Sequence, residues 1–456
     1  MQDTIAAIAT GGVIAAIGIV RVSGDGAIEA ADAVFRAAGG VRLIGAESRR
    51  MYYGELIGPD GGLLDMCLCF ISRGPDSYTG EDTAEFHCHG SPVVLSEVLH
   101  ALFNRGVRHA LPGEFTKRAF LNGRMDLTQA EAVIDLIEAE TPRAAQNAAV
   151  QLRGAIGKRF DSVYGALLDV MAHFHAVIDY PDEDIDDFEM QNHLTALRGA
   201  EEELTGMLLT CARGRVLRDG VPTAIIGRPN TGKSSLLNAL LGYQRAIVTD
   251  IPGTTRDTIE EKIAIGGTLL RIIDTAGIRE TNDMIEILGV KRTQEALAGA
   301  GLAIIVFDGS EPLKSEDRAA LDMIPTNVPK LAVINKSDLP PVLDISEINE
   351  LGLSHCRVSA LTGEGLDALE AEIKKLLPEP SAAPDWGLIT NMRQADTIKR
   401  SRDDIIGSID AMMNGMTPDA VLVHVEQALT TIGEITGKTM REDVIDRIFE
   451  RFCVGK

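Results

Sequence analysis

Residues 227–235 read GRPNTGKSS, directly after the strand-like run PTAIIG and before a helical stretch. A strand, a glycine-containing turn and a helix in this order predict a phosphate-binding loop, whose backbone N–H groups and helix N-terminus face the ligand. Gly227 and Gly232 permit the tight turn, Lys233 reaches the outer phosphates, and Ser234 holds Mg²⁺. A glycine-rich turn without a ligand is the alternative, but the flanking strand and helix favour a nucleotide site.

The chain around this loop alternates strand-like and helical runs from residue 221 to about 376. The strand-like runs are PTAIIG, TLLRIIDT, GLAIIVFD and KLAVINK. Such alternation is typical of an α/β domain with a doubly wound parallel sheet. We expect this inserted P-loop domain at residues 218–378.

Further loops follow in the order that a guanine nucleotide site needs. DTAG at 274–277 places a carboxylate near the metal and a flexible glycine N–H near the terminal phosphate. Asp338, in NKSD, can accept two hydrogen bonds from a guanine edge, which adenine cannot supply. SAL at 359–361 supplies the remaining base-side loop, and Thr255 in GTTRD completes the magnesium shell. These loops together predict a GTPase.

The catalytic residue is less evident, because Ile278 stands where Ras-type enzymes carry a glutamine that orients water. Glu280 is the nearest candidate for that role. An exposed loop glutamate is as often a solvated charge, so spacing alone leaves both interpretations open.

The remaining chain contains two kinds of sequence. Residues 1–118 mix short apolar runs with turn clusters, which predicts an α+β domain. Residues 119–217 and 379–456 carry apolar residues at three- and four-residue steps, which predicts helices. We expect the helices on both sides of the P-loop domain to pack together as one discontinuous all-α domain.

Composition narrows the classes of function. The formal net charge of −23 argues against broad attraction to nucleic acid, so any RNA contact must be local. No apolar run reaches the ~18 residues of a membrane span, and the N-terminus lacks the basic start of a signal peptide. The six cysteines lack the dense spacing of a secreted disulfide scaffold. We therefore expect a cytoplasmic protein without a membrane partner.

Cysteine and histidine residues also occur close together in the first 118 residues. Cys67 and Cys69 lie two residues apart in LLDMCLCFIS, and we expect both on the buried face of one strand. His87-Cys88-His89 has residue types that bind metals, but it lacks further ligands at a recognisable spacing. Core packing is the favoured interpretation of the first pair, and a metal site is disfavoured for the second group.

Several signatures spread over the chain resemble the MnmE (TrmE) family of tRNA-modification GTPases. They are SYTGEDTAEFHCHG at 77–90, PGEFTKRAFLNGRMDLTQAEAVIDLI at 112–137, GRPNTGKSSLLNAL, DIPGTTRD, DTAGIRE, NKSD and the final CVGK. The resemblance implies that residues 1–118 form a tetrahydrofolate-binding and dimerisation domain, and that the protein is a homodimer.

By this resemblance the GTPase is activated by K⁺, which stands where an arginine finger acts in other enzymes. The implied K⁺ ligands are Asn230, Thr249, Ile251 and Thr254, while Ser234 and Thr255 hold Mg²⁺. Glu280 is implied to orient the attacking water through a bridging water. The expected GTP-binding residues are Asn230, Thr231, Gly232, Lys233, Ser234, Ser235, Thr249, Asp250, Ile251, Pro252, Gly253, Thr254, Thr255, Asp274, Thr275, Ala276, Gly277, Asn335, Lys336, Asp338, Ser359, Ala360 and Leu361.

The resemblance also implies a pocket for a tetrahydrofolate derivative, either 5-formyl- or 5,10-methylene-tetrahydrofolate, in a fold shared with the glycine cleavage T protein. The matching residues are Arg21, Glu81, Arg124 and Lys456, with Cys453 as a candidate catalytic thiol. The residues alone leave other interpretations open: surface charges for the arginines, a helix cap for Glu81, a frayed end for Lys456 and an inert thiol for Cys453.

Two positions depart from the family pattern. The loop from Gly11 to Ala16 lacks the proline and polar residue that usually follow Ala-Thr. Position 124 is Arg where some relatives carry Lys, so a planar guanidinium group replaces the compact ammonium group of lysine. Both departures affect the expected geometry of the folate pocket.

The implied reaction adds an aminomethyl or carboxymethylaminomethyl group to carbon 5 of the wobble uridine of certain tRNAs. It uses a one-carbon unit from tetrahydrofolate and an MnmG-type partner that depends on FAD and NADH. The alternative is a regulatory switch GTPase of the ribosome-assembly type, with no chemistry beyond GTP hydrolysis. All nucleotide loops fit both, so the discriminating residues lie outside the P-loop domain.

Overall fold

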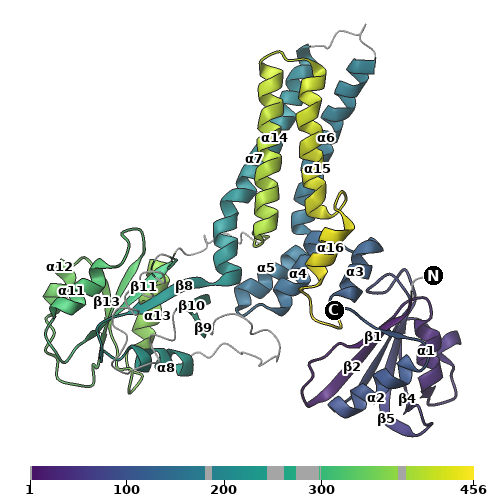
Figure 1. Ribbon diagram of the computed structural model, residues 1–456, viewed down its shortest axis with the longest axis horizontal. Helices are drawn as coiled ribbons and strands as arrows, with labels where there is room; N and C mark the ends of the chain where they lie inside the picture. Colours follow the sequence, from purple (N-terminus) through teal and green to yellow (C-terminus); the bar gives the residue numbers. More distant parts are fainter. Residues whose placement is uncertain (1–2, 180–186, 244–260, 274–296, 298, 378–386) are drawn as a thin grey trace. The chain divides into compact units, whose positions relative to one another are not determined.

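The computed structural model describes residues 3–179, 187–243, 261–273, 297, 299–377 and 387–456 (Figure 1). Contacts divide the chain into two compact units. The first comprises Met1–Ile134, Gln151–Glu203 and Arg400–Lys456, and the second comprises Asp135–Val150 and Leu204–Lys399. Each unit therefore combines segments that are distant in the sequence, and the finer domain boundaries expected above stay a prediction.

The first unit contains a seven-stranded sheet with the order β3-β4-β5-β6-β2-β1-β7, antiparallel except for the β1–β7 pair. Helices α1 (Ala27–Val34) and α2 (Pro92–Phe103) pack on one of its faces, beside the short 3₁₀ helix η1 (Leu43–Gly45). The strands are β1 (Ile5–Ile8), β2 (Ala15–Ser23), β3 (Phe35–Ala37), β4 (Arg50–Ile57), β5 (Leu63–Ser72), β6 (Thr83–Gly90) and β7 (Arg108–His109).

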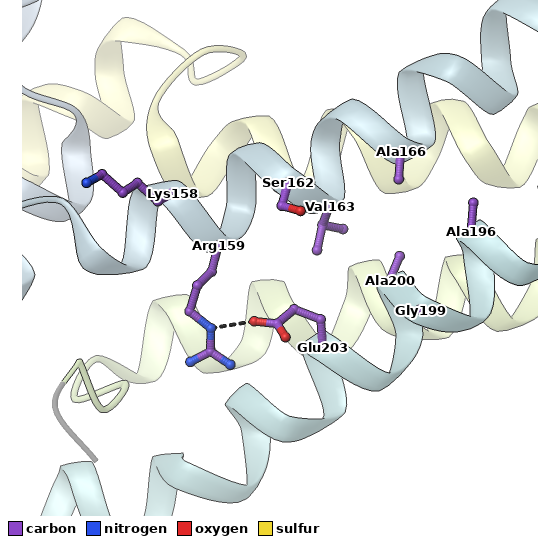
Figure 2. Close-up of a pocket in the computed structure, with 9 residues that line it drawn as sticks. All are labelled: Lys158, Arg159, Ser162, Val163, Ala166, Ala196, Gly199, Ala200 and Glu203. Atoms are coloured by element: carbon purple, nitrogen blue, oxygen red, sulfur yellow. Dashed lines mark hydrogen bonds and ion pairs between the residues drawn. The ribbon is translucent and has the colours of Figure 1, made fainter. Parts of the chain in front are cut away.

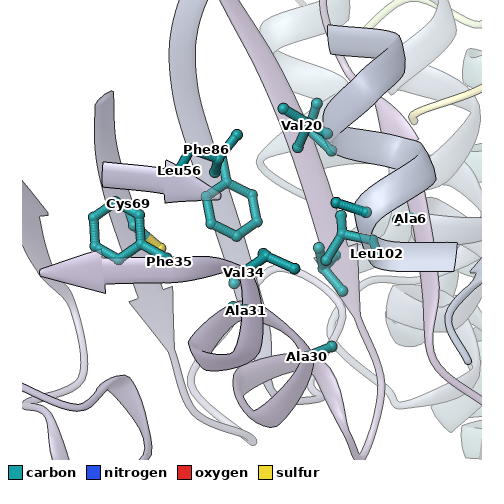
Figure 3. Close-up of a cluster of buried hydrophobic side chains, with 14 of the residues drawn as sticks. Ala6, Val20, Ala30, Ala31, Val34, Phe35, Leu56, Cys69, Phe86 and Leu102 are labelled. Carbon is teal, nitrogen blue, oxygen red and sulfur yellow. The ribbon is translucent and has the colours of Figure 1, made fainter. Parts of the chain in front are cut away.

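The core of this sheet lies between the strands and the two helices (Figure 3). Val20 of β2 and Phe86 of β6 point into it, and Cys67 and Cys69 of β5 are 3% and 0% exposed there. The prediction that both cysteines pack in the core is therefore confirmed. Because side chains alternate along a strand, Arg21, Glu85 and the other residues between the core positions lie on the opposite face.

Helices make up the rest of the first unit and the connections to the second. The buried residues of α6 recur at three- and four-residue steps, and α6 packs side by side with α15 (Figure 1). These helices precede and follow the P-loop segment in sequence, so the helical domain is discontinuous, as expected. The bounds are α3 (Glu114–Leu121), α4 (Leu127–Ile137), α5 (Pro142–Leu152), α6 (Ala155–Asp179), α7 (Asp187–Asp219), α14 (Met392–Met413), α15 (Pro418–Thr436) and α16 (Glu442–Phe449).

The second unit contains a six-stranded sheet with the order β13-β12-β11-β8-β10-β9. Residues of the central strand β11 alternate between two separate hydrophobic clusters, one on each face of the sheet, and helices contribute to both. This is the predicted doubly wound arrangement. The elements are β8 (Val221–Ile226), β9 (Glu261–Ile265), β10 (Thr268–Ile273), β11 (Leu302–Asp308), β12 (Lys330–Asn335), β13 (Ser354–Arg357), α8 (Lys233–Tyr243), α11 (Ser315–Asp322), α12 (Ile345–Glu350) and α13 (Leu366–Leu376).

The strand β9 adds an antiparallel edge to this otherwise parallel sheet. Only Gly266 and Gly267 separate β9 from β10, and both have positive φ, 61° and 81°. A parallel connection needs a crossover of a dozen or more residues, whereas two glycines of positive φ suit a tight hairpin. No helix among the described residues is both long enough and apolar enough to cross a bilayer.

Candidate functional site

The phosphate-binding loop joins β8 to α8, as the sequence predicts. Gly227 and Gly232 adopt φ of 148° and 91°, in the region that favours glycine, and the exposed Asn230 adopts φ of 63°. A Cβ on Gly232 would lie 2.2 Å from Asn335 Nδ2, and one on Gly227 would lie 2.5 Å from the carbonyl oxygen of Val306. The loop therefore packs so closely against the ends of β11 and β12 that these two positions leave no room for a side chain.

Lys233 begins α8 with its ammonium group folded over this loop. Its Nζ donates to the carbonyl oxygens of Gly227 and Arg228 at 2.8 and 2.9 Å. Burial lowers the pKa of Lys233, and the positive charge of Arg228 lowers it further. Two carbonyl dipoles thus hold the cation that the sequence assigns to the outer phosphates. Ser234 follows it half-buried, and Ser235 is exposed.

Asn335 connects the phosphate loop to the base-side loop. Its Nδ2 donates to the carbonyl oxygen of the fully buried Thr231 at 2.9 Å, and its Oδ1 accepts from the backbone N–H of Ala360 at 3.0 Å. One amide side chain therefore satisfies a donor and an acceptor from loops more than 100 residues apart in sequence. This contact fixes the distance between the phosphate and base ends of the site.

The base end of the site gathers the other predicted residues. Ser359 Oγ donates to Asp338 Oδ1 at 2.6 Å, which orients the carboxylate expected to read guanine. Lys336 has φ of 64° and donates through Nζ to Asp308 Oδ2 at 2.6 Å. Burial opposes the charge on Asp308, but hydrogen bonds from Lys336 and Ser310 outweigh it and hold the pKa of that carboxyl below its ordinary value. Leu361 is 85% exposed beside this loop.

The remaining predicted nucleotide residues lie outside the described ranges. They are Thr249, Asp250, Ile251, Pro252, Gly253, Thr254, Thr255, Asp274, Thr275, Ala276, Gly277 and the candidate catalytic Glu280. Their assignment stays a prediction. The described part of the chain holds no group of three or more His, Cys, Asp or Glu residues suited to a metal ion.

The expected folate residue Arg21 lies on the open face of the N-terminal sheet, opposite the core. Its Nε donates to Glu85 Oε1 at 2.7 Å, and its guanidinium carbon lies 5.4 and 5.6 Å from the ring centres of Tyr78 and Phe115. Arg21 and Glu85 are direct partners in the β2–β6 register. The arginine is thus held between two aromatic rings and a carboxylate, and is not a mobile surface charge.

The last residues of the sequence join this group. Val454 forms an antiparallel bridge with Pro112, and a Cβ on Gly455 would lie 2.3 Å from the carbonyl oxygen of Ile8. Burial lowers the pKa of Lys456, the charge of Arg21 adds to this effect, and Glu85 and Cys453 oppose it. Lys456 is therefore docked near Arg21 and Glu85. Cys453 is exposed, and its carbonyl oxygen accepts from the N–H of Gly113 at 3.3 Å.

Glu81 has a different environment from Glu85. It is buried, its Oε2 accepts from Ser23 Oγ at 2.7 Å, and both of its oxygens lie 3.2–3.3 Å from Arg118 Nη1. Arg118 in turn bonds Asp3 and Glu114. Such a fully engaged buried ion pair is typical of a structural group. The structure therefore groups Arg21 and Lys456 with Glu85, and places Glu81 in the network beneath them.

The two departures from the family pattern lie near this group. The side chain of Arg124 is exposed and runs over Gly80, where a Cβ would lie 3.3 Å from Arg124 Cγ. The loop of residues 11–16 is exposed, and Thr10 Oγ1 before it accepts from the N–H of Ile19 at 3.1 Å.

Sequence reasoning did not single out Glu85, Tyr78 or Phe115 as neighbours of Arg21. Glu85 stands four residues after Glu81 in GEDTAEF, and the motif alone does not say which carboxylate faces Arg21. The pairing of β2 with β6 would have supplied that signal, because its register aligns position 85 with position 21 and keeps Val20 and Phe86 on the buried face.

A cavity of about 480 Å³ lies elsewhere in the first unit, between α6 and α7 (Figure 2). Figure 2 shows an ion pair from Arg159 to Glu203 across it. The other lining residues are Lys158, Ser162, Val163, Ala166, Ala196, Gly199 and Ala200. None of the predicted site residues lines this cavity, and its small side chains indicate a gap in helix packing and not a reaction site.

Known proteins match the chain along its full length. A family profile described as the MnmE helical domain matches residues 127–453, and one described as the GTP-binding protein TrmE N-terminus matches residues 4–124. The chain is 42% identical to the tRNA modification GTPase MnmE of Symbiobacterium thermophilum, over 100% of both chains. It is 44% identical to that of Geobacillus kaustophilus, over 100% of this chain and 99% of the relative.

Proposed function

The chain belongs to the MnmE family of tRNA modification GTPases, and we propose that it is a K⁺-activated member that uses a tetrahydrofolate one-carbon unit. In this proposal it acts with an MnmG-type partner, dependent on FAD and NADH, on carbon 5 of the wobble uridine of certain tRNAs. A tRNA substrate implies a cytoplasmic location. GTP hydrolysis would drive a conformational step between the two chemical centres.

The observation that carries the folate part is the grouping of Arg21, Glu85 and Lys456 on one open sheet face. A pterin ring carries adjacent N–H groups, which can donate hydrogen bonds to a carboxylate such as that of Glu85. Tyr78 offers a flat aromatic surface on which the ring can stack. The tail of a folate carries carboxylates at the end opposite the pterin, which the exposed Arg124 would attract, while Arg21 and Lys456 would line the pocket beside Glu85. A switch GTPase without further chemistry has no use for this arrangement.

The nucleotide part rests on the loops of the second unit. Thr231 to Ser234 would cradle the phosphates with backbone N–H groups, and Asp338 would select guanine. Mg²⁺ would be held by Ser234 and Thr255. The exposed amide of Asn230 fits K⁺, together with Thr249, Ile251 and Thr254, and the bound ion would supply positive charge between the β- and γ-phosphates.

Hydrolysis also needs an oriented water and, in this proposal, a second copy of the chain. Glu280 would orient the attacking water, and Cys453 would serve as a thiol beside the one-carbon centre. The homodimer would form through the N-terminal domains. The large apolar side chains exposed on the open sheet face, among them Ile17, Tyr53 and Leu68, support that surface as the contact.

The deciding experiment compares wobble nucleosides by mass analysis after incubation of tRNA with this protein and its flavin partner. GTP, K⁺ and the folate are each omitted in turn, and binding of 5-formyl-tetrahydrofolate is titrated in parallel. The proposal expects loss of the modified nucleoside in each omission. Absence of folate binding, with GTP hydrolysis intact, would favour the switch GTPase.

A further inference from the structure

Arg228, the second residue of the phosphate-binding loop, has a side chain that none of the nucleotide motifs explains. Its Nη2 donates to Glu311 Oε2 at 2.6 Å. Its Nε donates to Asp317 Oδ2 at 3.3 Å and lies equally far from Oδ1. Both carboxylates belong to the segment that follows β11 and opens α11, so Arg228 ties the loop to a different part of the GTPase unit.

The carboxylate partner Asp317 is itself fixed in place. Its Oδ2 accepts from the backbone N–H of Lys314 at 3.0 Å, which caps the first turn of α11. The side chains of Arg228 and Asp317 are 10% and 4% exposed. Separating this ion pair would cost free energy, because it would leave a buried charge without a partner. The pair therefore holds Arg228, and the loop to which it belongs, against the start of α11.

The backbone of Arg228 carries the consequence into the phosphate site. Its carbonyl oxygen accepts from Thr231 Oγ1 at 3.1 Å and from Lys233 Nζ at 2.9 Å. The side chain of Arg228 is held by two carboxylates, and its backbone carbonyl accepts the hydrogen bonds of Thr231 and Lys233. The position of Arg228 therefore determines the positions of Thr231 and Lys233.

The same segment after β11 also holds the base end of the site. Asp308 accepts from Lys336 Nζ at 2.6 Å, and the N–H of Gly309 donates to the carbonyl oxygen of Asn335 at 2.8 Å. Residues 308–317 thus contact the phosphate loop through Arg228 and the base loop through Lys336. A shift of this segment would displace both ends of the bound nucleotide.

We propose that Arg228 is a positioning residue for GTP binding, which acts through its ion pairs with Glu311 and Asp317 to hold the phosphate loop and Lys233 in the nucleotide-ready geometry. The alternative is direct attraction, in which the positive charge of the Arg228 guanidinium attracts the phosphates of GTP. In that case the negative charges of Glu311 and Asp317 only reduce this attraction. The two accounts predict opposite signs for the same substitutions.

The test replaces the carboxylates by amides of the same shape in the full chain, as Asp317→Asn and Glu311→Gln. Each substitution removes a negative charge near an anion site, so direct attraction predicts tighter GTP binding. Positioning predicts GTP binding about tenfold weaker, because the guanidinium loses its anchor. Dissociation constants are measured by titration with a fluorescent GTP analogue. Glu316→Gln, an exposed neighbour on α11 without a bond to Arg228, is the matched control and should leave binding unchanged.

Steady-state kinetics separate positioning from a general loss of structure. Arg228→Ala is expected to raise the KM for GTP by about tenfold while kcat changes by less than about threefold, and Arg228→Lys to recover only part of the loss. Tighter or unchanged GTP binding in the amide variants would overturn the proposal. Should Asp317→Asn fail to fold, Glu311→Gln decides alone, because Glu311 is half-exposed and tolerates exchange.

Discussion

The side chain of Asn335 donates to the carbonyl oxygen of Thr231 and accepts from the N–H of Ala360, so one amide spans the phosphate and base loops. We expect Asn335→Ala to weaken GTP binding about tenfold or more, because a buried carbonyl and a buried N–H lose their partners at a cost of about 1–3 kcal/mol. Nucleotide titration measures the loss. Asn349→Ala, on the exposed side of α12, is the control.

The carboxylate of Asp338 is expected to decide the choice of base. Asp338→Asn replaces one acceptor by a donor, which no longer fits the N–H groups of guanine but fits the 2-carbonyl of xanthine. We predict a loss of GTP affinity of about 100-fold, because one hydrogen bond is lost and the other loses its charge assistance, with a gain for xanthosine triphosphate. Competition binding checks this. Equal affinity of the wild type for GTP and ATP would refute the role of Asp338.

The two glutamates of GEDTAEF are expected to separate in function. Glu85→Gln should abolish binding of 5-formyl-tetrahydrofolate with little change in melting temperature, because Glu85 is half-exposed beside Arg21. Glu81→Gln should lower the melting temperature by several degrees, because it breaks a buried ion pair with Arg118. Calorimetry and thermal melting distinguish the two. The reverse pattern would assign the pocket to Glu81.

The docked end of the chain gives a prediction about Gly455. Its φ of 95° and the carbonyl of Ile8 at 2.3 Å from a built Cβ leave no room for alanine. Gly455→Ala should displace Lys456 and weaken folate binding about tenfold or more, while GTP hydrolysis in the second unit stays unchanged. Gly415→Ala is the control, because it has a similar φ of 64° with open space around it. Equal folate affinity in both variants would argue against a role for the docked end.

The exposed Asn230 is expected to confer dependence on K⁺. We predict that GTP turnover in K⁺ greatly exceeds that in Na⁺, since the amide oxygen helps to hold the ion, and that Asn230→Ala removes the difference. Turnover in the two salts at equal ionic strength is the measurement. Asn238→Ala, which makes the same change on the exposed side of α8, should keep the difference. Similar wild-type rates in both salts would contradict the K⁺ site.

Sequence patterns placed the loop between β8 and α8 and the NKSD run after β12 correctly, because these signals are local. Glycine at 227 and 232 is required by the positive φ and the close packing of this loop. The structure adds contacts between distant segments, such as the hydrogen bond from Asn335 to Thr231 and the ion pair of Arg228 with Asp317, which no local pattern contains. These contacts depend on how β8, β11 and β12 lie side by side, which spacing along the chain does not specify.

The folate group shows the same division between local and long-range information. The motifs predict a role for Arg21 and Lys456 at a folate, which stays a prediction, but they do not show that the neighbour of Arg21 is Glu85, a fact that follows from the β2–β6 register. Likewise, Arg118 in the PGEF signature is a structural cation for Glu81, and its sequence context alone gives no sign of this. Glu81 lies before β6 and Glu85 lies within it, so two carboxylates four residues apart in sequence bind different partners.

The pairing of α6 with α15 has a consequence for synthesis on the ribosome. Residue 179 ends α6, and the first residue of α15 is 418, so 238 residues lie between the two helices. At about 5–20 residues per second, the apolar stripe of α6 waits roughly 12 to 48 seconds for its partner. During that interval Phe160, Leu167 and Phe174 have no α15 to pack against, so this stripe of α6 lacks that cover while the P-loop segment is synthesised.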